Sequence, residues 1–199
     1  MKRKIRHYET LLTLTGAIAA AKDPEQLCRS TVAQVAETLD VKGCALFLIN
    51  RRTDELEIAA AYGLSQEYID KGPVSALKSI ADSFKDGPVA IYDVADDPRI
   101  QYPEAAVKEG IASIMSLPMV MHGAVMGALR VYTADPWEFT LDDVNFMQAV
   151  AQLTALALDR CRLSRGLKTS IEILKTMRDT RKRAVFRTKE NRSAVQGIA

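Results

Sequence analysis

The stretch from residue 111 to residue 132 constrains the fold more than any other part of this chain. It holds two apolar runs, 111–121 and 124–132, joined by the dipeptide His122-Gly123, and this arrangement predicts a β-hairpin. Neither run alternates between apolar and polar residues as a strand with one solvated face does. Both faces of these central strands must therefore be covered by other parts of the chain.

Two kinds of segment are available as cover. Amphipathic helices are predicted at both ends of the chain, whereas residues 65–110 combine turns, a strand and short helices. Helices pack closely against a sheet, but loops over a rigid sheet leave gaps in which small molecules bind. We therefore expect helices on one face of the sheet and a pocket on the other face, between the sheet and residues 65–110.

The order of the predicted elements indicates an α+β fold in which helices cover one face of an antiparallel sheet. Helices are predicted over residues 4–21, from Asp23 to before Gly43, and onward from Thr140; strands are predicted over 44–49, 55–62 and 89–94 and in the hairpin. Asp23, and Thr140 with Asp143, are placed to cap helices. The strand over 55–62 is expected to lie nearer the sheet edge or to have one wetter side, because Leu56, Ile58, Ala60 and Tyr62 alternate with Glu55, Glu57, Ala59 and Ala61.

Composition limits the class of protein. The chain of 199 residues, 48% of them hydrophobic, can bury one sizeable core. No apolar run approaches the roughly 20 residues that span a bilayer. Cys28, Cys44 and Cys161 are far apart and form no C-x-x-C pair, so we expect reduced, buried thiols rather than disulfides or a metal site. These features favour a cytoplasmic protein.

The net charge of +2 conceals two basic ends. Residues 1–8 hold four Lys or Arg and no acidic residue, and residues 178–192 hold seven Lys or Arg and two acidic residues. Clustered basic residues attract polyanions such as nucleic acid or an anionic surface. Because no recognised nucleic-acid motif accompanies them, we favour a solvated helix face and tail.

The last predicted helix carries a heptad pattern that Arg160 and Ser170 interrupt. Such a stripe left in water is an association site, so we expect a homodimer through a helical coiled coil. A frayed monomeric helix remains the alternative. The seam residues are Leu153, Leu156, Leu163, Leu167, Leu174 and Met177.

Arg130 is the most informative polar residue, because it stands alone in an apolar strand where an unpaired buried charge would cost several kcal/mol. One hypothesis makes it the floor of a pocket, binding a ligand carboxylate or phosphate in bidentate fashion. The alternatives are an internal salt bridge to Glu57 or Asp93, or a side chain that reaches out to solvent at the strand end.

The length of the hairpin turn decides which residues share the pocket floor. Ile114 and Ser116 lie on one strand face, and a three-residue turn places Arg130 and Tyr132 opposite them. A two-residue turn reverses that pairing. Three aromatic residues are candidates for walls or lid, with ordinary core packing as the alternative for each: Tyr62, Phe84 and Tyr102.

Several short motifs occur in an order and spacing typical of one family. They are Tyr62-Gly63-Leu64, Asp93-Val94 followed by Asp97-Pro98-Arg99, Gly110-Ile111-Ala112-Ser113 leading to Leu117-Pro118-Met119, Gly127-Ala128-Leu129, and Phe139-Thr140. With these motifs the chain resembles a GAF domain over residues 8–163. The resemblance implies a central six-stranded antiparallel sheet in a sensory module that is commonly dimeric through its end helices. We expect an N-terminal helix of a dimer bundle (1–22), a GAF domain (23–160) and a C-terminal helical extension with a basic tail (161–199).

The resemblance leaves the ligand and any cofactor unidentified, because GAF domains bind cyclic nucleotides, tetrapyrroles, small metabolites or nothing known. The NKFDE-type set of cyclic-nucleotide binders is not found here. Residues 45–160 contain no cysteine, which argues against covalent bilin attachment and against methionine sulfoxide reductase activity. His7 and His122 are expected to face solvent, so neither is a candidate haem ligand.

Asp93 enters through the same resemblance. The Asp-Ile-Pro stretch of bilin-binding relatives lies beside their chromophore, so Asp93-Val94 is expected to border the pocket, with loop capping as the alternative. Asp96 and Asp97 lie close to Asp93 in sequence, but the turn pattern around Pro98 favours caps over a cation site.

The leading hypothesis is a cytoplasmic, homodimeric sensor in signal transduction that is not an enzyme. It binds an unidentified small molecule over the sheet and relays occupancy through the C-terminal helix to an output partner, either a separate protein or a segment outside this sequence. A ligand-free dimerisation scaffold, with its cavity filled by its own side chains, is the first alternative. A small redox enzyme of the free methionine sulfoxide reductase type is the second.

Overall fold

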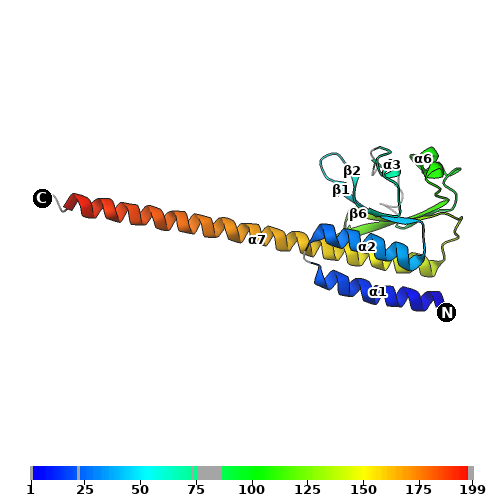
Figure 1. The fold of residues 1–199 in the computed structure, drawn as a ribbon, viewed down its shortest axis with the longest axis horizontal. Helices are drawn as coiled ribbons and strands as arrows, with labels where there is room; N and C mark the ends of the chain where they lie inside the picture. Colours follow the sequence, from blue (N-terminus) through cyan, green and yellow to red (C-terminus); the bar gives the residue numbers. More distant parts are fainter. Residues whose placement is uncertain (1, 22, 73, 76–86, 197–199) are drawn as a thin grey trace. The chain divides into compact units, whose positions relative to one another are not determined.

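The computed structural model describes residues 2–21, 23–72, 74–75 and 87–196 (Figure 1). Its elements are α1 (Lys2–Ala20), α2 (Pro24–Leu39), β1 (Gly43–Asn50), β2 (Glu55–Tyr62), α3 (Gln66–Ile69), β3 (Val74–Ser75), β4 (Val89–Ile91), α6 (Pro103–Lys108), β5 (Ser113–Met121), β6 (Ala124–Thr133) and α7 (Leu141–Gln196). The chain divides into two compact units, Met1–Asp159 and Arg160–Ala199. The first unit holds every strand.

The strands form one antiparallel sheet in the order β3-β2-β1-β6-β5-β4. Five of them are three or more residues long, and the two-residue β3 pairs with the outer side of β2. The α+β class and the antiparallel sheet are confirmed. The predicted hairpin forms the pair β5 and β6, and β6 lies at the centre of the sheet beside β1.

The hairpin turn has two residues, but a bulge restores the pairing expected for three. His122 and Gly123 have φ values of 53° and 75°, the left-handed pair that a tight hairpin turn needs. The register then shifts between Met119 and Val120, where β6 has one extra residue. Beyond the shift, Ser116 lies opposite Arg130, and Ile114 lies opposite Tyr132.

A second bulge lies in the pairing of β2 with β1. The register with β1 shifts between Leu46 and Phe47, so Ile58 pairs with Phe47 while Tyr62 pairs with Cys44. Two residues that lie directly opposite each other in a ladder share a face, and successive residues of a strand alternate between faces. Phe47 and Cys44 are three residues apart in β1, so their partners Ile58 and Tyr62 lie on opposite faces of the sheet. The bulge thus divides the apolar residues of the strand: Leu56 and Ile58 face one core, and Ala60 faces the other. β2 lies second from the edge of the sheet, in agreement with one of the two alternatives expected for it.

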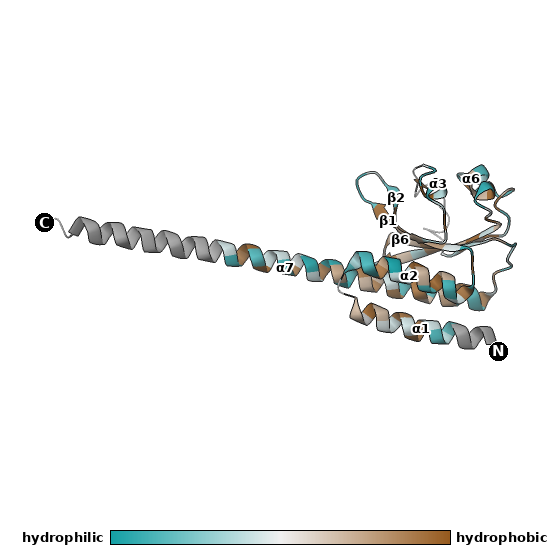
Figure 2. Ribbon diagram, in the orientation of Figure 1, coloured by the Kyte–Doolittle hydropathy of each residue, from teal (hydrophilic) through white to brown (hydrophobic). Residues whose placement is uncertain are grey.

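Two cores cover the two faces of the sheet, as the hairpin pattern predicted. On one face α2 and the first turns of α7 pack against residues such as Leu46, Leu117 and Leu129, and α1 packs on the outer side of these two helices (Figure 1). On the other face Tyr68 of α3 and Ala106 of α6 pack with Phe47, Ile114 and Tyr132 and other residues of the second core. Figure 2 shows the hydrophobic strands between these two layers. In its described parts, the segment from Ser65 to Gly110 thus covers this face through α3 and α6 and extends the sheet through β3 and β4.

The start of α7 is fixed by a reciprocal cap and by a contact with α1. Asp143 Oδ2 accepts hydrogen bonds from the backbone N of Thr140 at 3.0 Å and from its Oγ1 at 2.7 Å, and Thr140 Oγ1 accepts from the N of Asp143 at 3.3 Å. The predicted cap is confirmed. The other carboxylate oxygen, Oδ1, lies 3.5 Å from His7 Nε2.

The expectation that His7 faces solvent is wrong. Its side chain is buried, and its ring stacks on Phe146 with the centroids 4.3 Å apart, because α1 packs this face against the start of α7. His122 is exposed in the hairpin turn, as expected, and its Nε2 lies 3.2 Å from Asp159 Oδ2.

Replacing Asp143 with alanine is expected to lower the free energy of unfolding by about 2 kcal/mol, because the change removes the acceptor for Thr140 and the partner of His7. Urea denaturation followed by circular dichroism measures this loss. Asp142→Ala is the matched control, since Asp142 lies in the same first turn but is exposed, and it should cost about 0.5 kcal/mol or less. Equal losses in the two variants would contradict the role given to Asp143.

Three further predictions concern the whole chain. Cys28, Cys44 and Cys161 are buried and are not joined in disulfides, as expected. Within the described ranges, every helix is too short or too polar to cross a bilayer. In the second unit, residues 160–196 are helical, and the seam residues Leu163, Leu167 and Leu174 are exposed. The side chain of Met177 lies outside the described residues.

Candidate functional site

Four of the predicted site residues meet on the face of the sheet opposite the helices. The β5–β6 register places Ile114 and Ser116 opposite Tyr132 and Arg130, and all four side chains are buried. Among the described residues, the hydroxyl of Ser116 has no hydrogen-bond partner. These four residues are called the floor cluster below. This grouping is the one predicted from the sequence for a three-residue turn, and the hairpin bulge produces the same pairing.

Arg130 lies in this cluster with its charge under an aromatic ring. Its side chain is 6% exposed, and the guanidinium carbon lies 4.7 Å from the centroid of the Phe47 ring. The two carboxylates considered as its partners are bonded elsewhere, since Glu57 accepts from Asn50 Nδ2 at 2.6 Å and Asp93 accepts from the N of Ala95 at 2.9 Å. The proposed salt bridges to Glu57 and Asp93 are therefore wrong.

Tyr132 and Tyr68 form the aromatic part of the cluster. Their rings meet edge to face with the centroids 5.9 Å apart, so Tyr68 of α3 covers Tyr132. Burial raises the pKa of Tyr132 to about 12, although the charge of Arg130 and a hydrogen bond from it act in the opposite direction. Burial also raises the pKa of Tyr68. Both phenols therefore stay neutral at physiological pH.

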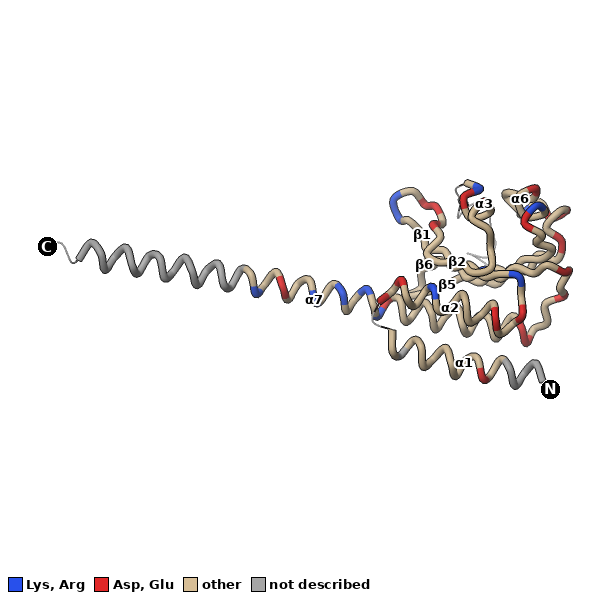
Figure 3. Tube along the Cα trace, in the orientation of Figure 1, with Lys and Arg blue, Asp and Glu red and all other residues tan. Residues whose placement is uncertain are grey.

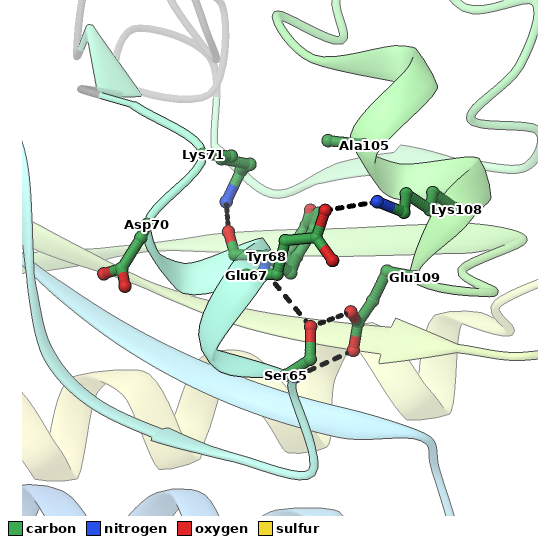
Figure 4. A pocket seen from close by; sticks show the side chains of 8 residues that line it. All are labelled: Ser65, Glu67, Tyr68, Asp70, Lys71, Ala105, Lys108 and Glu109. Atoms are coloured by element: carbon green, nitrogen blue, oxygen red, sulfur yellow. Dashed lines mark hydrogen bonds and ion pairs between the residues drawn. The ribbon is translucent and has the colours of Figure 1, made fainter.

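Outside Tyr68 lies an open pocket of about 560 Å³ between α3 and α6. Charged residues of both signs lie on these two helices and on the segments that follow them (Figure 3). Figure 4 shows the lining side chains converging from both helices. They are Ser65, Glu67, Tyr68, Asp70, Lys71, Ala105, Lys108 and Glu109.

Glu109 and Ser65 join the two sides of the pocket. Glu109 Oε1 accepts from the backbone N of Ser65 at 2.9 Å, and Oε2 accepts from the Ser65 hydroxyl. The Lys42 ammonium lies 3.8 Å from Oε1. Burial raises the pKa of Glu109, but the hydrogen bonds from Ser65 and the charges of Lys42 and Lys71 outweigh it, so the net pKa lies below its ordinary value. The Glu109 carboxylate is therefore ionised, and each of its oxygens accepts a hydrogen bond from Ser65.

The other charged lining residues also interact with the protein. Glu67 forms an ion pair with Lys108 across the mouth of the pocket, and Asp70 accepts from Gln66 Nε2 at 2.9 Å. Both members of the Glu67–Lys108 pair are largely exposed, so the pair contributes little to stability.

Lys71 differs from these residues because its side chain turns back over Tyr68. Its Nζ donates to the carbonyl oxygen of Tyr68 at 2.9 Å and lies 3.7 Å from the centroid of the Tyr68 ring (Figure 4). Burial, aided by the positive charge of Arg130 and opposed by Glu109, lowers the pKa of Lys71 to about 8. A measurable fraction of this amine is therefore neutral near pH 8.

The structure places three other predicted site residues away from the pocket and does not describe a fourth. Tyr62 is turned to the helix face by the β2 bulge, and its hydroxyl donates to Glu37 of α2 at 3.0 Å. Asp93 is exposed and caps its own loop. The hydroxyl of Tyr102 accepts from Gln101 Nε2 at 3.2 Å, and its side chain does not line the cavity. Phe84 lies outside the described residues.

The pocket residues Ser65, Tyr68, Lys71 and Glu109 are absent from the sequence-based prediction. One local signal was available, because serine is a preferred N-cap residue of helices. Ser65 caps α3 in this way, and its hydroxyl accepts a hydrogen bond from the backbone N of Tyr68 at 3.1 Å. A cap fixes where a short helix begins, but not which part of the sheet it covers. The contact of α3 with α6 is therefore visible only in the structure.

Comparison with known proteins identifies the fold. The family model of the GAF domain matches residues 23–158. No curated protein matches the chain significantly. The GAF domain of a phosphoenolpyruvate-protein phosphotransferase from Coxiella burnetii superposes with a TM-score of 0.72 at 19% identity, over 81% of this chain and 98% of that chain.

Two further solved structures share the fold, one of an enzyme with its substrate and one of a chromophore-binding domain. The free methionine-R-sulfoxide reductase from Neisseria meningitidis, in complex with its substrate, has a TM-score of 0.70 at 18% identity, over 82% of this chain and 94% of that chain. The chromophore-binding domain of a bacteriophytochrome from R. palustris has a TM-score of 0.67 at 10% identity, over 83% of this chain and 64% of that chain. At such identities the likeness establishes the fold and leaves the ligand open.

Proposed function

The chain belongs to the GAF domain family, whose members are sensory and regulatory modules of signalling proteins, and from this membership we propose that it binds a small molecule in the pocket between α3 and α6. The observation that carries the proposal is the position of that pocket. It opens on the loop-covered face of the sheet, directly outside the Tyr68 ring that covers the buried Arg130 and Tyr132. A ligand there reaches the sheet through one aromatic side chain.

Two of the related structures support a small-molecule role, because one is described with its substrate and another as a chromophore-binding domain. The described lining of this pocket holds no cysteine, so we propose a ligand that is held without a covalent thioether. We also propose a cytoplasmic location, which the three free thiols support.

Native mass spectrometry of the freshly purified full chain tests the proposal. A co-purified compound that leaves on partial denaturation is the expected result. Its identity would name the ligand, and a titration monitored by chemical-shift changes at Ser65, Tyr68 and Glu109 would place it. A compound that shifts only residues on the α1–α2 side of the sheet would contradict the assignment of the pocket.

Relay to an output partner is proposed to run through a dimer of the long helix. In the second unit, the side chains of Leu163, Leu167 and Leu174 are 62%, 65% and 64% exposed, and they repeat at intervals of four and seven residues. In the first unit, Leu156 is exposed and Leu153 is partly buried. Apolar residues at this spacing are stabilised when a second copy covers them, so we propose a homodimeric coiled coil that signals to a separate protein.

A ligand-free dimerisation scaffold is the second candidate, and one observation favours it. The space immediately above the floor cluster is filled by the protein's own Tyr68 ring, which contacts Tyr132. Spin labels on the long helix would measure the distance between the two helices of the proposed dimer. If that distance does not change with any added compound, and if no compound co-purifies, a scaffold function is better supported than a sensor function.

We propose that the chain is not an enzyme of the methionine sulfoxide reductase type. Cys44 is fully buried in β1, and burial raises the pKa of its thiol, so the reactive thiolate is disfavoured. In the native protein at pH 8, Cys44 is expected to resist a soluble disulfide reagent and to react only after denaturation. Turnover of free methionine sulfoxide that is lost in Cys44→Ser would overturn this proposal.

A further inference from the structure

The charged side chains that line the α3–α6 pocket differ in whether they have a partner within the protein. The carboxylate of Glu67 pairs with Lys108, that of Asp70 accepts from Gln66, and that of Glu109 accepts two hydrogen bonds from Ser65. Each lining carboxylate thus interacts with a donor of the protein. Figure 4 shows that Asp70 also points away from the other lining residues.

Lys71 is the lining cation for which the described residues provide no carboxylate partner. Its Nζ makes one hydrogen bond, to the carbonyl of Tyr68, and rests on the face of that residue's ring. An ammonium carries three donors, and two of those of Lys71 are not used in that hydrogen bond. The charge of Glu109 acts on Lys71 without forming an ion pair with it, so an anion in the adjacent space would stabilise this partly desolvated cation.

We propose that the pocket binds a small anion, through a carboxylate or phosphate group that is seated on the Lys71 ammonium. This inference rests on the proposed function and specifies the class of ligand for the same pocket. The cavity of about 560 Å³ is large enough for a small metabolite.

The electrostatic surroundings of Lys71 agree with this assignment. The groups that face it are Arg130 from β6, Glu109 from α6, and the Tyr68 ring and carbonyl from α3. The pKa of Lys71 is lowered to about 8 by burial first and by the charge of Arg130 second. The negative charge of a bound anion favours the charged form of Lys71 and opposes both effects, so binding should raise this pKa and take up a proton near pH 8.

The experiment is a titration of the full chain with sodium phosphate and, separately, with sodium succinate at constant ionic strength. Backbone amide shifts of residues 65–71 and 105–109 report on the pocket. At pH 7 we expect saturable shifts with at least one of the two probes. In Lys71→Met the affinity for that probe should fall by about tenfold or more. Because burial opposes the charged form of Lys71, this variant should be at least as stable as the wild type at pH 7.

Lys108→Met is the matched control, because it removes an equal charge from the same cavity but from an exposed ion pair. It should change the affinity by less than about twofold. Succinate remains fully ionised between pH 7 and pH 9, so its affinity should fall roughly tenfold over that interval as Lys71 loses its proton.

Three outcomes overturn the anion assignment: shifts that do not saturate with either probe, wild-type affinity in Lys71→Met, or an equal loss in Lys108→Met. An uncharged compound that binds in the pocket of Lys71→Met as well as in the wild type overturns the assignment and leaves the sensor function standing. The sensor function fails separately, if no compound of any charge binds in the pocket and the helix spacing never changes.

Discussion

Replacing Gly127 with alanine is expected to destabilise the protein by about 3 kcal/mol or more, the largest effect of any single methyl group considered for this chain. Gly127 lies in β6 between Leu48 of β1 and Met119 of β5, next to the hairpin bulge. A Cβ atom built there would overlap the carbonyl oxygen of Phe47 and lie 3.1 Å from its carbonyl carbon. Because the obstacle is backbone in a central strand, the sheet cannot yield without loss of the β1–β6 ladder.

Urea denaturation monitored by circular dichroism measures the effect of Gly127→Ala. Gly16→Ala is the matched control, since Gly16 lies in α1 and no atom lies within 4 Å of the added methyl group. In that helix alanine should stabilise the protein by roughly 0.5–1 kcal/mol, because glycine loses more backbone freedom on folding. If Gly127→Ala is as stable as the wild type, the close approach of β6 to β1 is not as described.

The double variant Leu163→Asp and Leu167→Asp is expected to weaken self-association by about a thousandfold or more. Each leucine that a partner helix covers contributes roughly 1.5–3 kcal/mol, and a dimer of the variant loses four of them. The new carboxylates also repel one another across a coiled-coil seam. Sedimentation equilibrium of the full chain over a range of concentrations provides the dissociation constant.

Thr169→Asp is the matched control for this pair. It adds a carboxylate to the same stretch of helix at an exposed position outside the leucine seam. It should leave the dissociation constant within about threefold of the wild-type value, since single exposed charges contribute little. A wild-type chain that stays monomeric at high concentration would refute the proposed dimer, and so would a double variant that associates normally.

The sequence predicted those parts of the fold that depend on local pattern. The two apolar runs of the hairpin required cover on both faces, and both cores are present. The caps at Asp23 and Thr140 follow from side-chain chemistry within four residues, and both form. Strand pairing and helix starts could be derived in this way because each depends on a periodicity or a short motif.

The candidate site was predicted only in part, because it depends on register and on tertiary contact. The prediction for a three-residue turn correctly grouped Arg130 and Tyr132 with Ser116. The turn itself has two residues, and the grouping holds only because the bulge in β6 shifts the register by one residue. A comparable bulge in β2 carried Tyr62 to the other face. No pattern within residues 65–71 indicates that Lys71 turns back over Tyr68, since that arrangement depends on how α3 docks against the sheet.

The outer strands of the sheet have a consequence for crowded solutions. The described edge strands are short, since β3 has two residues and β4 has three. Each edge strand therefore offers few unpaired backbone N–H and C=O groups with which a strand of another chain could pair. Lateral growth of the sheet into filaments is thereby discouraged. The dimer proposed above would instead depend on side chains of the helices, where single substitutions can tune it.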